Sequence, residues 1–393
     1  MISVDEALTR VLALAHPPKA GTLPLAEAAG RVLLHPAVAR LTQPPFDSAA
    51  MDGYALRDAD LPGPLRVIGE AAAGHPWNGQ ATPGTAVRIF TGAPVPAGYD
   101  RVVMQENCMR EGEKVTITDA SGGTNIRARG GDFAEGQAIK APRLLRAADI
   151  GLLAAMNVAQ VTVAHRPRVA IIASGDELVR PGEAVAQGQI VSSNDLIVAA
   201  LARDAGAVAD ILPIARDTES SLRDVFAQAA GADLIVTIGG ASVGDHDLVG
   251  KVAVDLGLER SFYKIAMRPG KPLMAGRMGN AAMLGLPGNP VSSYVCAILF
   301  MQPLIHAMQG LPEQPRKLRA RLTCDLPPEG ARQHYLRARL VAGDGLSGIT
   351  PYKDQDSARL TVLADADALL VRPANDPARQ AGDVVDYLPL HAG

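Results

Sequence analysis

Short apolar runs rich in β-branched residues alternate with helical stretches in the middle of the chain, and this alternation most constrains the fold. The predicted strands are residues 169–173, 208–214, 234–238 and 281–286. The predicted helices are residues 194–204, 218–230, 247–256 and 291–308. Strands that are apolar along their whole length are buried on both faces, and helical connections allow neighbouring strands to run parallel. The sequence therefore predicts an α/β domain whose parallel sheet is covered by helices on both sides.

Polar and glycine-rich segments follow each predicted strand. They are SGDEL (174–178), Asp217, GGASVGDHD (239–247) and PGNPVSS (287–293), in chain order. In open parallel sheets, ligands bind outside the carboxyl ends of the strands. We therefore expect these segments to converge at one edge of the sheet, with acidic groups beside glycine-rich turns.

Two segments rich in glycine and proline, MRPGKP (267–272) and GLPGNPVSS (285–293), indicate an anion pocket built from rigid backbone. Proline fixes φ and glycine lets a ligand approach the backbone closely. Arg268 and Lys271 supply positive charge. This combination predicts a phosphate-like or oxyanion substrate.

The second of these segments predicts the start of a helix. Asn289 suits an N-cap and Pro290 suits the first helical position. Ser292 and Ser293 would then lie in the first turn, where unpaired N–H groups and the helix dipole favour an anion. The alternative interpretation is an ordinary capped helix.

Acidic residues beside a phosphate pocket indicate a divalent cation. Mg²⁺ typically uses one or two carboxylates together with phosphate oxygens. The candidates are Glu177, Asp217, Asp245 and Asp247. The alternative is that some of these acids cap helices, which applies to Asp176 and Asp245, or that Asp217 is a turn residue.

The rest of the chain has a different pattern. Residues 3–14 and 25–34 predict helices, residues 42–138 predict a small β-rich domain, and residues 142–153 return to helical patterning. A proline-containing linker at 310–316 precedes a last β-rich segment, which we expect to form a small barrel or sandwich. Its predicted strands are residues 333–341, 359–363, 368–371 and 384–389.

Composition limits the functional class. A net charge of −3 and few aromatic residues argue against nucleic-acid binding, which needs a basic face and stacking side chains. Cys108, Cys296 and Cys324 are widely spaced, so neither a disulfide framework nor a structural zinc site is supported. The N-terminus fits a capped helix better than a signal peptide, and polar residues interrupt the apolar stretch 291–308. We expect a cytoplasmic protein without a membrane span.

The N-terminal β-rich part contains its own polar motifs. FDSAAMDGYAL (46–56) carries Asp47 and Asp52, TGAPVP (91–96) is a rigid turn, and NIRARGGDF (125–133) carries Asp132. Composition alone would assign these motifs to surface loops.

Taken together, the motifs resemble those of a known family. SAAMDGYAL, TGAPVP, NIRARGGDF, SGDEL, GGASVGDHD, MRPGKP and GLPGNPVSS occur in the order and spacing of the molybdopterin molybdenumtransferases, the bacterial MoeA proteins similar to the C-terminal E domain of gephyrin. The resemblance implies an α/β multidomain protein. Its expected domains are a discontinuous helical dimerisation domain (1–40 plus 139–167), an inserted β-rich domain (41–138), a molybdopterin-binding α/β domain (168–310) and a C-terminal β-barrel (316–393).

The resemblance also implies an activity. The family inserts molybdenum from molybdate into adenylyl-molybdopterin and releases AMP, usually with Mg²⁺. Because the substrate brings its own sulfur ligands, the enzyme needs no cysteine cluster. The implied partners are a second copy of the chain in a homodimer, the molybdopterin adenylyltransferase and apo-molybdoenzymes. In such a dimer, Asp52 and the 125–133 loop would face the α/β domain of the other subunit.

The residues implied by the resemblance fall into four sets. The catalytic set is Asp52, Asp132, Glu177, Asp217, Asp247, Lys264, Arg268 and Lys271. The cofactor-binding set is Thr91, Ser174, Gly175, Gly239, Gly240, Ser242, Gly244, Pro287, Gly288, Asn289, Pro290 and Ser292. The molybdate set is Lys271, Ser292, Arg337 and Ser357, with Arg339 as a rival for Arg337. The metal set is Glu177, Asp217 and Asp247.

Two other classes of function stay open at this point. A molybdopterin adenylyltransferase or a related nucleotide hydrolase would share the α/β domain, but the additional β domains argue against a stand-alone adenylyltransferase. A non-catalytic scaffold or cofactor carrier is the other alternative. The presence of Asp217, Asp247 and Lys271 favours catalysis, because a scaffold does not need these charges at one edge of the sheet.

Overall fold

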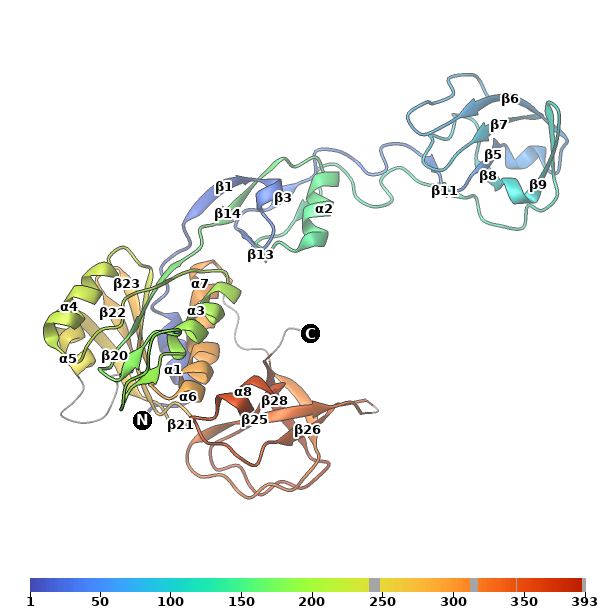
Figure 1. Cartoon of the computed structure of the whole chain (residues 1–393). Helices are drawn as coiled ribbons and strands as arrows, with labels where there is room; N and C mark the ends of the chain where they lie inside the picture. Colours follow the sequence, from blue (N-terminus) through green and yellow to red (C-terminus); the bar gives the residue numbers. More distant parts are fainter. Residues whose placement is uncertain (240–247, 312–316, 344, 391–393) are drawn as a thin grey trace. The chain divides into compact units, whose positions relative to one another are not determined.

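A computed structural model describes residues 1–239, 248–311, 317–343 and 345–390. The chain divides into two compact units (Figure 1). Unit 1 comprises Met1–Gly21, Gly30–Val32 and Ala164–Gly393, and unit 2 comprises Thr22–Ala29 and Leu33–Val163. This division is coarser than the predicted domains, whose boundaries stay a prediction.

The α/β part of unit 1 contains the predicted parallel sheet. Its described strands lie in the order β18 (Val208–Ile211), β15 (Arg168–Ala173), β19 (Leu234–Ile238), β23 (Ala281–Leu286), β22 (Pro272–Met278) and β20 (Leu258–Lys264). The first of these, from β18 to β23, pair in parallel. The antiparallel strands β22 and β20, which extend the sheet at the β23 edge, were not predicted from the sequence.

Helices cover both faces of this sheet, as predicted. The apolar side chains of α1 (Val4–Leu12), α3 (Asn194–Asp204), α6 (Pro290–Cys296) and α7 (Gln302–Met308) form one core with Val169 and Val236. Those of α4 (Glu219–Gln228) and α5 (Leu248–Asp255) form the other core with Ile172 and Ile235. Figure 1 shows these two groups on opposite sides of the sheet. The strands are buried on both faces because alternate residues belong to different cores.

The helix that follows β23 is the one helix in the described part of the chain that is both long and apolar enough to cross a membrane. A π-helical stretch, Ala297–Met301, joins α6 to α7. The whole helix Pro290–Met308 has 19 residues and a mean hydropathy of 1.5, so by length and composition it could cross a membrane. However, 72% of its apolar window is buried inside the protein. Its hydropathy is therefore that of a central core helix.

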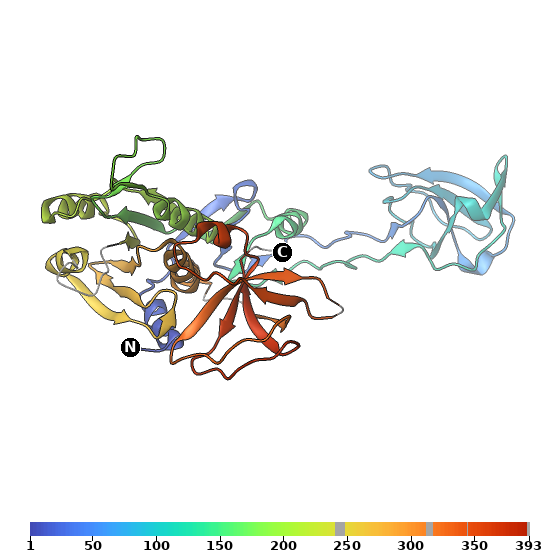
Figure 2. The ribbon, with the colours of Figure 1, turned by 60° about the horizontal axis from the view of Figure 1, so that its bottom comes forward.

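The C-terminal part of unit 1 is a β-barrel, which the sequence predicted as a barrel or sandwich. Its strands are β24 (Leu318–Leu322), β25 (Gln333–Val341), β26 (Gly348–Pro351), β27 (Ala368–Arg372) and β28 (Val384–Pro389). The sheet closes because β25 pairs with both β26 and β27 (Figure 2). The short strand β21 (Met267–Arg268) pairs with β25 and so connects the barrel to the α/β part.

Unit 2 contains a β-rich part, as predicted. The larger sheet has the order β8 (Arg101–Met104), β5 (Gly53–Leu56), β7 (Thr85–Ile89), β6 (Leu65–Ala71), β10 (Lys114–Ile117) and β9 (Cys108–Glu111). Short pairs join β4 (Ser48–Ala49) to β11 (Ile126–Arg127) and β3 (Ala37–Val38) to β12 (Ala138–Ile139). A smaller sheet has the order β1 (Ala20–Pro24), β14 (Gln160–Ala164), β2 (Val32–Leu33) and β13 (Arg143–Leu144), with α2 (Ala147–Ala155) beside it.

Two secondary-structure predictions were wrong. Residues 25–34 form a 3₁₀ turn, Leu25–Glu27, and the strand β2, because Gly30 has φ +72° and Leu33 pairs with Val163. Residues 359–363 do not form a strand: α8 covers Leu360–Ala364, and only Leu363 in it is buried. In both places a few apolar residues gave an ambiguous pattern, which tertiary contacts decide.

Candidate functional site

A cavity of about 320 Å³ lies at the carboxyl ends of β15, β19 and β23. Predicted site residues that line it are Ser174, Glu177, Gly239, Gly288, Asn289 and Pro290. The SGDEL segment, Gly239 and the PGNPVSS segment therefore meet at one edge of the sheet, whereas Asp217 does not line the cavity and residues 240–247 lie outside the described residues. Sequence reasoning missed Ser192, Ser193 and Asn194, which also line the cavity. The signal that could have revealed them is the run of Ser, Ser and Asn at the start of the predicted helix 194–204.

The ends of neighbouring strands approach each other closely at the cavity. Gly239 has φ +88°, donates its N–H to the Leu286 carbonyl at 3.2 Å, and would place a Cβ only 2.9 Å from the Ser174 carbonyl oxygen. Glycine is needed there because any side chain would press on the β15 backbone. The Ser174 hydroxyl is buried and has no hydrogen-bond partner among the described residues. An unpaired polar group in a cavity can bind water or a polar ligand.

The SGDEL turn is held by Arg216, which sequence reasoning also missed. Arg216 Nη1 donates to the carbonyl oxygens of Gly175, Asp176 and Leu178 at 3.4, 3.1 and 3.2 Å. Asp217 then donates its N–H to Asp176 Oδ1 at 3.1 Å. These bonds fix the turn that carries Glu177 beside the segment that carries Asp217.

Carboxylates gather beside the cavity. Partial desolvation raises the pKa of the Asp217 carboxyl group, and the negative charges of Asp176 and Glu177 raise this pKa further, against a hydrogen bond from the Asp176 backbone. Mutual repulsion of this kind is relieved by a cation. Among the described residues, no three His, Cys, Asp or Glu side chains stand ready to hold a metal, and Asp247 lies outside them. The metal set stays a prediction.

Gly175 provides a test of whether the SGDEL turn leaves room for a side chain beside Glu177. Its φ is +151°, and a Cβ at this position would overlap the Glu177 carboxylate. Gly175→Ala should lower the free energy of unfolding by about 1–3 kcal/mol and displace Glu177. Urea unfolding followed by circular dichroism measures the change. Gly182→Ala is the matched control, because Gly182 also has a positive φ (+90°) but open space around it. Because the overlapped atoms are the end of a flexible side chain, the two variants should lose similar stability, and a crystal structure of Gly175→Ala in which Glu177 has not moved would contradict the overlap.

The helix N-terminus at Pro290 has the predicted geometry. Asn289 is the N-cap, Pro290 begins the helix, and no side-chain hydrogen bond of Asn289 caps it. Asn194 Nδ2 donates to the Gly288 carbonyl at 2.6 Å and so holds the preceding turn. Ser292 is buried in the first turn. Because Asn289 lines the cavity, this helix end lies at the cavity wall.

The predicted molybdate pair comes from the barrel. The Ser357 carbonyl accepts the Val291 N–H at 3.0 Å, so Ser357 lies at the first turn of α6. The Arg337 guanidinium is buried and donates to the Asp356 and Arg359 carbonyls at 3.0 and 3.3 Å. Arg339 instead stacks on Tyr352. Arg337, on β25, therefore contacts the loop that carries Ser357, whereas Arg339 contacts Tyr352. The choice between them for the molybdate pair, and the role of the pair, stay predictions.

The predicted cations lie in and just before the MRPGKP segment (267–272). Lys264 pairs with Pro272 across the β20–β22 ladder, and Ile265 donates its N–H to the Lys271 carbonyl at 3.1 Å, so the two lysines are close in the backbone. Arg268 Nη2 donates to Glu329 Oε2 at 3.1 Å. Substrate binding by Arg268 would have to replace this ion pair.

Three motifs in unit 2 form one cluster. Ala49 donates its N–H to the Ala93 carbonyl at 2.9 Å, and Ala50 donates to the Asn125 carbonyl at 2.8 Å. The Asp52 carboxylate accepts bonds from Thr91 N and Oγ1, both at 2.8 Å. These bonds lower the pKa of the Asp52 carboxyl group. Asp47, Asp52 and Thr91 are exposed, but the motifs also contain buried residues, such as Ala49 and Ala93, and are tied together.

The remaining predicted residues divide into two groups. Asp132 is exposed in unit 2 and donates its N–H to the Gln43 carbonyl at 3.1 Å, and Pro287 is buried after β23. Gly240, Ser242, Gly244 and Asp247 lie outside the described residues.

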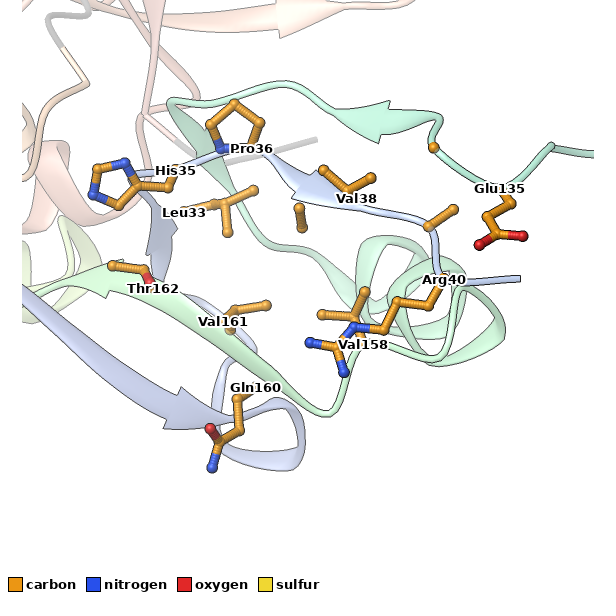
Figure 3. A pocket seen from close by; sticks show the side chains of 13 residues that line it. Leu33, His35, Pro36, Val38, Arg40, Glu135, Val158, Gln160, Val161 and Thr162 are labelled. Atoms are coloured by element: carbon orange, nitrogen blue, oxygen red, sulfur yellow. The ribbon is translucent and has the colours of Figure 1, made fainter. Parts of the chain in front are cut away.

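A second cavity, of about 470 Å³, lies in unit 2 and contains none of the predicted residues. Figure 3 shows Leu33, Val158 and Val161 on its walls, with Arg40 and His35 at different ends. Its larger size does not make it the functional site, because it lacks the strand-end loops.

Comparison with protein families covers almost the whole chain. Residues 2–157 match the MoeA N-terminal region (domain I and II). Residues 170–307 match a family described as a probable molybdopterin binding domain. Residues 319–390 match the MoeA C-terminal region (domain IV). The matches follow the order of the motifs along the chain.

Individual relatives agree with this assignment. The molybdopterin molybdenumtransferase of a Nostoc species is 37% identical over 92% of this chain and 86% of that protein. The molybdopterin molybdenumtransferase of Haemophilus influenzae is 36% identical over 79% of this chain and 78% of that protein. The crystal structure of a molybdopterin biosynthesis MoeA protein from Pyrococcus horikoshii has a TM-score of 0.83 at 27% identity, covering 99% of this chain and 100% of that one. Sequence, fold and strand-end cavity agree: the chain is an enzyme of the molybdopterin molybdenumtransferase (MoeA) family, in molybdenum cofactor biosynthesis.

Proposed function

We propose that this enzyme transfers molybdenum from molybdate to the dithiolene sulfurs of adenylyl-molybdopterin and releases AMP. The observation that carries the proposal is the cavity at the carboxyl ends of β15, β19 and β23. It combines a helix N-terminus suited to an anion with Glu177, beside which Asp176 and Asp217 form an acidic cluster. A substrate with both a polar ring and a pyrophosphate matches this combination.

Polar groups in the cavity would orient the substrate. The Ser174 hydroxyl has no partner among the described residues, so it is available to the pterin or to a phosphate oxygen. Gly239 and Gly288 leave room for the substrate to approach the backbone. Lys264 and Lys271 would supply positive charge for phosphate and molybdate. Ser292, Arg337 and Ser357 would form the molybdate site at the barrel side of α6.

Mg²⁺ fits the acidic side of the cavity. Glu177 and Asp217, together with Asp247, would hold it, since the pKa of Asp217 is raised by neighbouring carboxylates that a cation would neutralise. When bound, Mg²⁺ neutralises charge on the phosphate oxygens and on the leaving AMP. Arg216 would keep Glu177 in place by holding the backbone of its turn.

The thiols of this chain are not needed as molybdenum ligands in this proposal. Burial raises the pKa of the Cys296 thiol, which lies in the core of the α/β part. A neutral, buried thiol is a poor metal ligand. The substrate's own sulfurs would therefore hold the molybdenum.

We further propose a cytoplasmic homodimer. In this dimer, Asp52, Thr91 and Asp132 of one subunit would complete the cavity of the other subunit. This arrangement would give a function to the three hydrogen-bonded motifs of unit 2. The expected protein partners are the molybdopterin adenylyltransferase and apo-molybdoenzymes. Nucleic acids and membranes are not expected partners.

An AMP-release assay tests the proposed reaction. Purified protein is given adenylyl-molybdopterin and Mg²⁺ with and without molybdate, and AMP is measured by chromatography. We expect molybdate to raise the rate by about tenfold or more, because it completes the set of reacting groups held in the site. Sulfate, a tetrahedral anion that cannot bind dithiolene sulfur in this way, is the matched control. AMP release at equal rates with molybdate and sulfate would indicate a plain nucleotide hydrolase.

A further inference from the structure

Arg88 lies on β7 beside the motifs that gather in unit 2, although no motif includes it. It pairs across the sheet with Tyr54 on β5. Its guanidinium lies 5.1 Å from the centre of the Tyr54 ring and 4.7 Å from that of Phe90. Contact with both rings restricts the guanidinium to one orientation. Phe90 directly precedes Thr91, which binds the Asp52 carboxylate.

The hydrogen bonds of Arg88 reach the backbone that carries Asp52. Nη1 donates to the Gly53 carbonyl at 3.0 Å, and Nη2 donates to Gln105 Oε1 at 2.5 Å. Gln105 in turn donates its N–H to the Asp52 carbonyl at 3.0 Å. The Arg88 side chain therefore holds the backbone at Asp52 in two ways: it binds the carbonyl of the next residue, Gly53, and it binds Gln105, whose N–H donates to the Asp52 carbonyl.

We propose that Arg88 is a positioning residue, which holds Asp52 so that its carboxylate stays on the N–H and hydroxyl of Thr91 and points at the substrate. The inference deepens the proposed function and rests on it for the role of Asp52. Arg88 acts through Asp52 and does not itself contact the reacting atoms.

Two features of Arg88 suit this role. Its planar fork reaches two acceptors, Gly53 O and Gln105 Oε1, at once, which the single ammonium of lysine cannot do in the same plane. Its charge also acts on Asp52: the bonds from Thr91 chiefly lower the pKa of the Asp52 carboxyl group, and the positive charge of Arg88 lowers it further. Loss of Arg88 should therefore loosen the Asp52 carboxylate and raise its pKa.

The test is a double-mutant cycle in the full-length protein. Arg88→Ala, Asp52→Asn and the double variant are compared in kcat and KM for molybdate-dependent AMP release. We expect Arg88→Ala to lower kcat by about tenfold or more, because small misplacement of a reacting group is costly. In the Asp52→Asn background, Arg88→Ala should have little further effect, since its target is gone. If the fold-losses in kcat of the two single variants instead multiply in the double variant, the two residues act independently and the proposal is overturned.

Control variants separate positioning from folding. Arg101→Ala is the matched control, because Arg101 lies on β8, on the other side of β5 in the same sheet, and also holds a loop, through Asp58 and the Ala120 carbonyl. It should lose as much thermal stability as Arg88→Ala but keep kcat. Arg88→Lys should behave like Arg88→Ala. An equal loss of kcat in Arg101→Ala, or wild-type kcat in Arg88→Lys, would contradict a positioning role for the planar guanidinium of Arg88.

A measurement without substrate distinguishes this inference from the proposed function. Carbon-13 NMR of the Asp52 side chain gives its pKa, which should rise in Arg88→Ala and stay unchanged in Arg101→Ala. An unchanged pKa in Arg88→Ala would overturn the positioning role. If Asp52→Asn keeps full activity while Arg88→Ala still shifts the pKa, the catalytic role of Asp52 is wrong and the structural link to Arg88 stands.

Discussion

Asp217→Asn should lower kcat for AMP release by about 10²-fold or more, which is the usual cost of losing one group that stabilises charge in a transition state. The amide keeps the size of the side chain but loses the negative charge that Mg²⁺ needs. The loss should be mainly in kcat, because the cavity walls that we propose to bind the pterin are unchanged. Steady-state kinetics at several Mg²⁺ concentrations measure it, and the variant should need more Mg²⁺ for half-maximal rate.

The pH dependence of the rate provides a second measurement of Asp217. Desolvation and the carboxylates of Asp176 and Glu177 raise its pKa above the ordinary value for aspartate. As the pH falls through this raised pKa, Asp217 takes up a proton and can no longer hold the cation. At Mg²⁺ concentrations below saturation, where the cation-free site takes up protons, the acidic limb of the rate profile should therefore lie above the ordinary value for aspartate and should disappear in Asp217→Asn.

Asp210→Asn is the matched control for both measurements. Asp210 lies on the same sheet, in β18, but forms a surface ion pair with Arg168 at 3.1 Å. This variant should keep the wild-type rate and pH profile. If Asp217→Asn is as active as Asp210→Asn, Asp217 does not hold the metal.

The sequence predicted the centre of the fold well because buried strands leave strong signals. The bounds predicted for 234–238 and 281–286 coincide with β19 and β23, whose residues are buried throughout. The predicted helix 194–204 coincides with α3. A strand covered on both faces must be apolar at every position, so its ends are visible where polar or glycine residues begin.

Other elements could not be predicted because distant partners determine them. The strand β2 exists because Leu33 pairs with Val163, far along the chain. Strands β20 and β22 form a ladder with register shifts and partly exposed residues, so they lack a clear alternating pattern. The short helix α8 has a single buried residue, Leu363, and the sequence offered too little to distinguish it from a strand.

The site residues also divide into those that a local sequence pattern predicts and those that depend on distant contacts. Glycine and proline motifs mark Gly239, Gly288 and Pro290 because local backbone geometry requires those residue types. The contribution of Arg216 depends on carbonyl groups some forty residues earlier in the chain, at Gly175 and Asp176. Such a long-range contact leaves no local pattern, so only the folded structure reveals it.

Asp376→Ala should destabilise the barrel by about 3–5 kcal/mol, which is the usual cost of breaking a buried ion pair by removing one partner. The Asp376 carboxylate is bound by Arg372 Nε and, at 2.6 Å, by Arg379 Nη2. Arg372 is 1% exposed and also donates to the Pro327 and Pro377 carbonyls at 3.0 and 2.9 Å. Without Asp376, a buried guanidinium keeps its charge and loses the carboxylate that balances it.

The measurement must report on the barrel itself. The chain has one tryptophan, Trp77, which lies in unit 2, so amide hydrogen exchange in β25 and β27 is the better probe. Asp386→Ala is the matched control, because Asp386 is exposed on β28 of the same barrel. Protection of these strands should fall strongly in Asp376→Ala and stay nearly unchanged in Asp386→Ala.

The same ion pair determines how barrel stability depends on pH. Burial alone would raise the pKa of Asp376, but the bonds from Arg379 and Arg372 outweigh it and hold the folded-state pKa below the ordinary value. A carboxyl group with a lowered pKa contributes stability that is fully present above the unfolded pKa of about 3.9 and is lost as the pH falls through the folded-state value. Barrel protection should therefore decrease below about pH 4 in the wild type, and less so in Asp376→Ala. If both proteins lose protection equally in acid, other carboxylates carry the acid sensitivity and the buried pair contributes little.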